Sequence, residues 1–211
     1  MRLASCVLAL TLVSVAVIAA TTTPASAALQ LNEILAGPAR DWDGSGAVST
    51  RDDEWVEVIN TSGGSITLEG YLITDGDSIP RYGLSGTLAA GEHLMITGKT
   101  SLDWERLVGQ PAFGLSLANT GDSVILWQIV GPDTVVVDRY TYKSHEAAAD
   151  RSVGRSPDGS GAWVLFDNLN PYTGSTLPIG TNCPPTPGAA NGCDVTPARK
   201  TTWGEVKHIY R

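Results

Sequence analysis

Short alternating stretches separated by strong turn signals constrain this chain more than any other sequence feature. Between Asp53 and Gly76, the sequence DEWVEVINTSGGSITLEGYLITDG predicts three strands joined by two turns. β-Branched and aromatic residues fill the strands, and Asn, Gly and Asp fill the breaks. Many short strands at this spacing predict an all-β sandwich or barrel. The predicted strands are Leu29–Leu35, Trp55–Asn60, Ser65–Leu68, Tyr71–Thr74, His93–Thr97, Ser123–Gln128, Val135–Tyr142 and Ala162–Phe166.

The stretch Trp55–Asn60 shows how one of these strands would sit in the fold. Side chains alternate between the two faces of a strand, so Val56 and Val58 share one face and are the natural core residues. Glu57 lies on the opposite face with its aromatic and aliphatic neighbours. One short helical segment, Ser101–Val108, is expected between strands.

The first 27 residues have the pattern of a secretory signal peptide. Arg2 precedes an uncharged apolar run from Leu3 to Ala20, and Ala25-Ser26-Ala27 has the small residues of a cleavage site. An uncleaved anchor is the alternative. Cleavage would leave no later stretch long and apolar enough to span a membrane. The sequence therefore predicts a secreted protein, extracellular or at the cell surface.

Charge and cysteine content narrow the classes of function. The formal net charge is −8, which disfavours binding to a phosphate backbone, so no nucleic-acid partner is expected. Of three cysteines, Cys183 and Cys193 remain after cleavage, and a pair in an exported chain predicts a disulfide. Two cysteines without a nearby histidine do not make a structural zinc site.

An acidic loop is the best candidate for a cation site. Asp41 and Asp43 belong to an Asp-x-Asp-Gly turn, and Asp53 and Glu54 form a second acidic cluster. Carboxylate oxygens on one side of a turn are typical ligands of Ca²⁺. The alternative is a solvated turn in which the aspartates accept hydrogen bonds from the backbone.

No pattern in the sequence indicates catalysis. The three histidines are His93, His145 and His208, and none belongs to a nucleophile elbow, a zinc-protease helix motif or a phosphate-binding loop. Ser144-His145-Glu146 are sequence neighbours, which is not how a catalytic triad is assembled. The sequence therefore predicts a protein that is not an enzyme.

The C-terminal residues 194–211 combine a linker with a short amphipathic stretch. Thr202 and Glu205 form a capping box for a helix to Tyr210. An isolated helix of this length is marginal, so it either docks on its own domain or waits for a partner. The docking face comprises Trp203, Val206, Ile209 and Tyr210.

Several segments, taken in order, resemble the lamin tail domain family. The family pattern of a strand with an Asn-rich turn, an L-x-G-W-x-L-x-D strand and an L-x-N-x-G-D-x-V turn recurs here, with Tyr71 where tryptophan is usual. The later segments resemble the closing part of secreted bacterial members. The segments are Trp55–Asn60, Leu68–Asp75, Leu88–Glu92, Leu117–Val124, Gly154–Gly159 and Thr186–Asn191.

The resemblance implies an immunoglobulin-like β-sandwich over residues 28–193, followed by the short helical tail. Such domains bind or display, so we expect a non-catalytic adhesion module. Its partner would be a cell-surface or extracellular protein or glycan. The alternative is an accessory module that targets extracellular hydrolases or nucleases, to which such domains are often fused.

Overall fold

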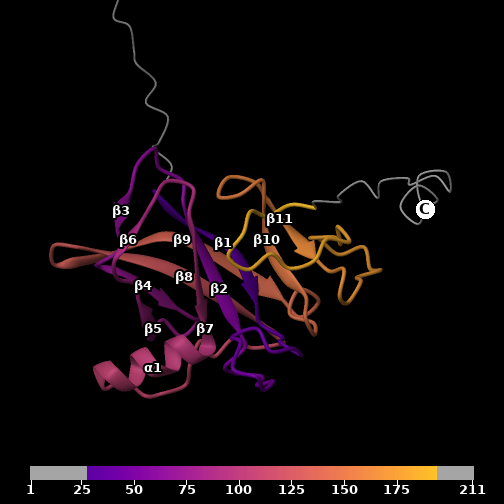
Figure 1. Ribbon diagram of the computed structural model, residues 1–211, viewed down its shortest axis with the longest axis horizontal. Helices are drawn as coiled ribbons and strands as arrows, with labels where there is room; N and C mark the ends of the chain where they lie inside the picture. The colour runs from indigo at the N-terminus through magenta and orange to yellow at the C-terminus, as the bar shows by residue number, and fades with distance from the viewer. Residues whose placement is uncertain (1–27, 194–211) are drawn as a thin grey trace, which may run out of the picture.

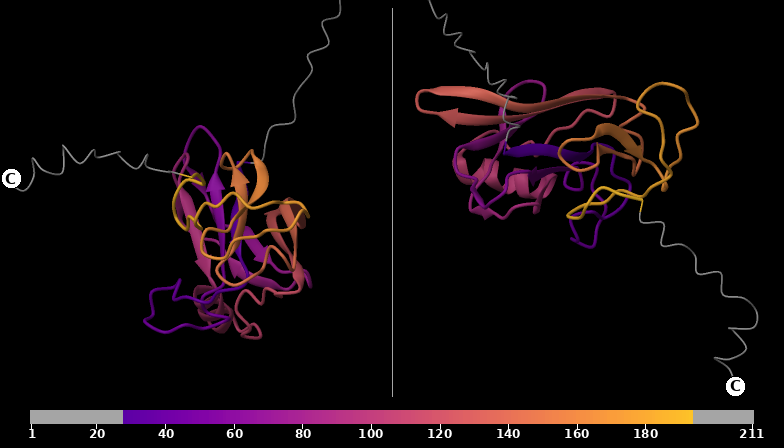
Figure 2. Two further views of the ribbon diagram at one scale, coloured as in Figure 1. Left: turned by 90° about the vertical axis from the view of Figure 1, so that its right-hand side faces the viewer. Right: turned by 90° about the horizontal axis from the view of Figure 1, so that it is seen from above.

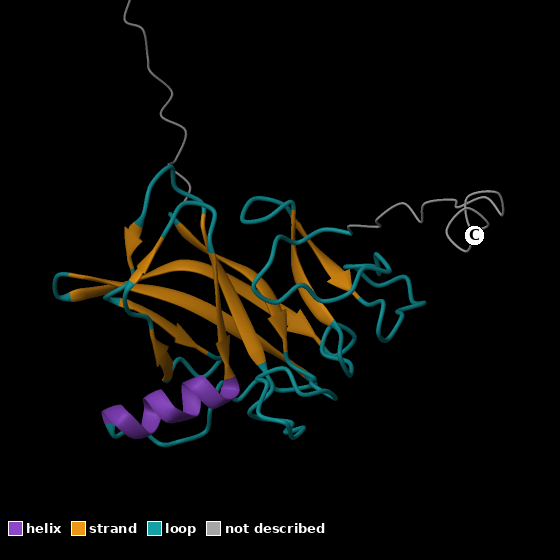
Figure 3. Cartoon of the chain, in the orientation of Figure 1, coloured by secondary structure: helices purple, strands orange, loops and turns teal. Residues whose placement is uncertain are grey.

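The computed structural model describes residues 28–193, which form a β-sandwich with one helix (Figure 1 and Figure 3). The expected signal peptide and the expected C-terminal helix lie outside these residues. The elements are β1 (Leu29–Leu35), β2 (Trp55–Asn60), β3 (Ile66–Thr67), β4 (Tyr71–Thr74), β5 (Pro80–Gly83), β6 (Thr87–Leu88), β7 (His93–Thr97), α1 (Gly98–Val108), β8 (Gly121–Val130), β9 (Asp133–Lys143), β10 (Ser152–Ser156) and β11 (Ala162–Phe166).

Two antiparallel sheets make up the sandwich. One has five strands in the order β11-β10-β1-β2-β7, and the other has four in the order β5-β4-β8-β9. A two-stranded ribbon of β3 and β6 lies beside them. The hairpin of β8 and β9 projects past the body of the domain, as the view from above shows (Figure 2). The predicted all-β fold class is confirmed.

The core lies between the two sheets. Leu31 and Val58 contribute from the five-stranded sheet, and Ile73 and Leu126 from the four-stranded sheet; each is at most 1% exposed. Val56 also belongs to this core, so the predicted core face of β2 is confirmed. Each inward apolar side chain alternates with one on the outer face, as the pleat of a strand requires.

The outer face of β2 is buried too. Trp55 and Glu57 are both fully buried. The loop before β2 covers Trp55, because Trp42 packs edge-on against it with ring centroids 6.1 Å apart. A segment near residue 188 covers Glu57. The five-stranded sheet is therefore covered on both faces around β2.

A bulge in β1 brings polar side chains to this outer face. The pairing of β1 with β2 shifts between Leu31 and Glu33, which leaves Asn32 as the extra residue. Asn32 and Glu33 are both fully buried, and the Asn32 amide donates to Glu57 at 2.9 Å. The bulge thus places an amide and a carboxyl group side by side with a second carboxyl group on β2.

The helix α1 follows β7 directly and begins at Gly98, before the expected start at Ser101. Thr97 caps its start by accepting a hydrogen bond from the Thr100 backbone N–H, and Gly109 ends it in the left-handed conformation with φ of 73°. Within residues 28–193, no helix has the length and apolar character needed to cross a membrane.

Candidate functional site

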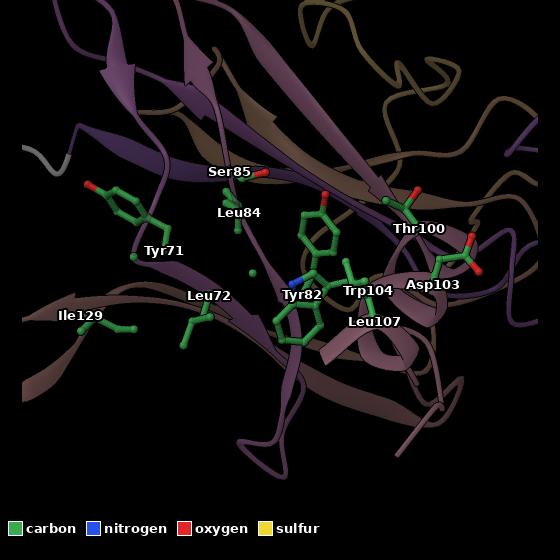
Figure 4. Close-up of a pocket in the computed structure, with 12 residues that line it drawn as sticks. Tyr71, Leu72, Tyr82, Leu84, Ser85, Thr100, Asp103, Trp104, Leu107 and Ile129 are labelled. Atoms are coloured by element: carbon green, nitrogen blue, oxygen red, sulfur yellow. The ribbon is translucent and has the colours of Figure 1, made fainter. Parts of the chain in front are cut away.

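A groove of about 560 Å³ opens between helix α1 and strands β4 and β5 (Figure 4). Its walls are mainly aromatic and aliphatic. The principal lining side chains are Leu72, Tyr82, Leu84, Trp104, Leu107 and Ile129.

Two aromatic rings form the centre of the groove. Tyr82 of β5 and Trp104 of α1 lie with ring centroids 6.1 Å apart and a tilt of 55°. Gly83 makes this approach possible, because a Cβ atom there would lie 2.9 Å from the Trp104 ring. On the rim, Leu107 is 84% exposed, so its side chain extends the apolar surface of the two rings into solvent. The groove therefore offers an apolar contact surface to solvent.

A buried ionic network holds α1 against β5 below this groove. The Arg81 guanidinium donates to Asp75 at 2.7 and 3.0 Å and to Glu105 at 3.4 Å. The Ser101 hydroxyl adds a bond of 2.7 Å to the Arg81 carbonyl. Burial raises the pKa of Asp75 to about 6, and the hydrogen bonds and positive charge of Arg81 oppose that rise.

Two glutamates fix the loop that follows α1. Glu105 accepts hydrogen bonds from the Phe113 and Gly114 N–H groups at 2.6 and 2.7 Å. Glu54 accepts from the Leu117 N–H at 3.1 Å, and burial raises the pKa of Glu54 to about 8. The Glu54 side chain therefore serves this loop, although the sequence indicated it as a cation ligand.

The other three predicted cation ligands do come together. Carboxylate oxygens of Asp41, Asp43 and Asp53 all lie within 4.8 Å of one another, and Glu54 is not among them. Asp53 is fully buried, whereas Asp41 is exposed. Three hard oxygen ligands from one loop suit a Ca²⁺ ion with further ligands from backbone carbonyls or water.

The same carboxylates also organise the loop backbone. Asp53 accepts hydrogen bonds from the N–H groups of Trp42, Asp43 and Ser49 at 2.6 to 2.9 Å. Ser45 donates to Asp43 at 2.9 Å, and hydrogen bonds from Ser45 lower the pKa of Asp43. The loop therefore keeps these side chains converged through its own hydrogen bonds, as the solvated-turn alternative expects.

The predicted cysteine pair is joined. A disulfide connects Cys183 and Cys193, whose Cα atoms are 5.1 Å apart. It closes a short loop at the end of the described chain.

The histidines within residues 28–193 sit in structural contacts. His93 Nε2 lies 3.5 Å from a carboxylate oxygen of Asp158 without forming a hydrogen bond. The His145 ring packs against Tyr172 at 4.8 Å and contacts the Pro178 carbonyl. Neither arrangement resembles the nucleophile, base and orienting acid of a triad.

The sequence did not identify the groove. Tyr82, Trp104 and Leu107 belong to no motif that sets them apart in the sequence. A Gly-Leu pair after an aromatic residue in Tyr82–Leu84 is also too common to indicate a site. The groove depends on how α1 lies across β5, which a local pattern does not encode.

Comparison with known proteins gives one result that identifies the chain. The family model of the lamin tail domain matches residues 22–144, more than half of the sequence. This span contains every strand from β1 to β9, and β10 and β11 complete the five-stranded sheet beyond it. No curated protein and no solved structure matches the chain. Lamin tail domains are immunoglobulin-like and non-enzymatic, and this chain belongs to the lamin tail domain family.

Proposed function

We propose that this protein is a secreted, non-catalytic binding module that acts outside the cell or at its surface. The groove between α1 and β5 is its contact site, and the exposure of Leu107 beside Tyr82 and Trp104 is the observation that carries this proposal. The apolar N-terminal run and the disulfide support export.

The chemistry of the groove favours an apolar segment of a protein over a glycan. A sugar is bound by several converging polar groups around an aromatic face, whereas the carboxylate of Asp103 and the hydroxyl of Thr100 at this groove are engaged by neighbours on the same helix or at its cap. Asp103 pairs with Lys99 and with Arg106, and Thr100 contacts Thr97 through their hydroxyl groups. Aromatic and aliphatic anchors in a pocket are typical of the centres of protein interfaces.

We test this proposal with the substitution Leu107→Asp in the full secreted chain. A charge on the groove rim should reduce binding to intact cells or to extracellular material at least tenfold. Leu107 is largely exposed, so the melting temperature should change little. Val108→Asp is the matched control, because Val108 is 46% exposed on the same helix and does not line the groove.

Two treatments of the cells or extracellular material distinguish a protein partner from a glycan. Protease treatment should abolish binding, and periodate oxidation of glycans should leave it intact. Equal binding by the Leu107→Asp variant and the wild type would contradict the groove as the contact site. Binding that persists after protease treatment and is lost after periodate treatment would contradict a protein partner.

We also propose that Ca²⁺ binds among Asp41, Asp43 and Asp53 and stabilises their loop. The convergence of three carboxylates supports this. Binding there would stiffen the cover over Trp55, because Trp42 in the same loop packs on that ring and donates through its indole N–H to Asp150.

A further inference from the structure

The segment from Cys183 to Cys193, which we call the strap, folds back over the outer face of the five-stranded sheet. It is drawn in yellow in Figure 1 and Figure 2. Its sequence, CPPTPGAANGC, contains no charged residue, and the disulfide joins its two ends. The strap is one chain thick, since Gly188 is exposed while its N–H donates to the fully buried Glu57.

Glu33 on β1 is the first anchor of the strap. Its carboxyl group accepts from the Thr186 hydroxyl at 2.7 Å and from the Thr186 N–H at 3.2 and 3.3 Å. The hydroxyl of Ser152 on β10 donates to the same group. One buried carboxyl group thus joins the strap to the neighbouring strands.

Glu57 on β2 is the second anchor. One of its oxygens accepts from the Gly188 N–H at 2.5 Å, and the other accepts from the Asn32 amide at 2.9 Å. A third anchor, Asp158, accepts from the Asn191 N–H at 2.8 Å and from Asn32 at 3.1 Å. The strap is therefore fastened by backbone N–H groups that donate to three acidic side chains.

These acidic groups have little positive charge around them. His93 on β7, 3.5 Å from Asp158, is the titratable group that approaches them from the opposite edge of β2. Arg155 on β10 turns its guanidinium to Asp138 at 3.0 Å instead. The strap contributes no positive charge, because it has no charged side chain. Ionising both glutamates would bury neighbouring negative charges without a compensating cation.

The pKa values reflect this environment. Burial raises the pKa of Glu33 to about 7; the hydrogen bonds from Ser152 and Thr186 oppose that rise without cancelling it, and the charge of Asp158 adds to it. Burial also raises the pKa of Glu57 to about 8; the hydrogen bonds from Asn32 and Gly188 oppose the rise, and the charges of Glu33 and Asp158 add to it. Both groups therefore change charge near neutral pH.

We propose that the strap is a pH-dependent latch, held against β1 and β2 while Glu33 and Glu57 are neutral and released as they ionise. Lifting the strap is the least costly way to hydrate the two carboxylates, because its cover is uncharged and one chain thick. β2 is held by ladders of hydrogen bonds to β7 and to β1, the latter interrupted at the bulge. The disulfide keeps the released segment as a closed loop that refastens at lower pH.

Amide hydrogen exchange of the intact, oxidised chain tests this proposal. Protection factors of the Thr186, Gly188 and Asn191 amides are measured by NMR at about pH 6 and pH 9, each normalised to the intrinsic exchange rate. The latch predicts at least a tenfold loss of protection at the higher pH. The Gly114 amide is the matched control, because it donates to Glu105, a buried carboxylate that is paired with Arg81.

The double variant Glu33→Gln, Glu57→Gln supplies the second arm. Glutamine keeps an oxygen acceptor and cannot ionise, so strap protection should stay within threefold between the two pH values. Strap protection in the wild type that changes no more than that of Gly114 would overturn the proposal. So would a loss of equal size in the double variant, because the change would then not come from these two side chains.

Discussion

Beneath helix α1, the buried carboxylates of Asp75 and Glu105 share the guanidinium of Arg81. Beneath the strap, Glu33 and Glu57 accept hydrogen bonds from uncharged donors alone. The carboxyl groups at both sites are buried, so the two sites differ in whether a positively charged side chain lies beside those groups. Burial raises the pKa of Asp75 to about 6 against the opposing effect of Arg81, whereas the pKa values of Glu33 and Glu57, which have no cation beside them, reach about 7 and about 8.

The largest effect on stability should come from removing Arg81, the cation beneath helix α1. Arg81→Met leaves Asp75 and Glu105 buried without a cation, which should cost about 3–5 kcal/mol of the free energy of unfolding. Chemical denaturation measures the loss. Arg106→Met, on the exposed side of α1, is the control and should change stability by less than about 0.5 kcal/mol. Similar values for both variants would show that the network does not fix the helix.

The contribution of Glu33 and Glu57 to stability should depend on pH in the opposite direction from that of a typical salt-bridged acid. Glu33 and Glu57 have folded pKa values of about 7 and about 8, above the ordinary 4.5. At pH values between 4.5 and these folded pKa values, the folded state therefore binds more protons than the unfolded state. This contribution to stability is complete below pH 4.5 and is lost as pH rises through 7 to 8.

We expect the free energy of unfolding to fall by roughly 4 kcal/mol between pH 6 and pH 9 because of these two groups. Denaturant titrations at several pH values measure the slope. In the double variant Glu33→Gln, Glu57→Gln, the free energy of unfolding should change less with pH over this range. If it changes as much as in the wild type, other groups cause the pH dependence.

Much of the sandwich could be predicted from local pattern. Stretches rich in apolar residues, such as Leu29–Leu35 and Trp55–Asn60, became strands with the expected limits. The strands that were missed have poor strand composition: β5 begins at Pro80, and β10 carries Gly154 and Arg155. Pairing with β4 and β1 makes them strands, and partners distant in sequence leave no local signal.

The candidate sites divide in the same way. Asp41, Asp43 and Asp53 converge because they belong to the one loop that joins β1 to β2, so their spacing in the sequence was informative. Glu54 was predicted to join them, but its partner is Leu117, 63 positions away along the chain. Glu33 meets Thr186 over 153 positions, which no motif could have indicated.

The smallest expected effect concerns the acidic loop, which combines features of both regions. Its carboxylates lack an arginine partner, but Asp41 is open to solvent, so a Ca²⁺ ion can supply the missing charge. Removing Ca²⁺ with a chelator should lower stability by on the order of 1 kcal/mol, measured as a fall in melting temperature. Asp41→Asn, Asp43→Asn should abolish the response, and an unchanged wild-type melting temperature would exclude a stabilising ion.

The most direct test of the difference between the two regions is an NMR titration of the side-chain carboxyl carbons of Glu33 and Glu57 in the folded protein. Cation-free burial predicts midpoints well above 6 for both groups, accompanied by shifts of the Thr186 and Gly188 amide signals at the same pH. Midpoints near 4.5, with strap signals that do not move, would contradict the account, because the strap would then cover permanently ionised carboxylates.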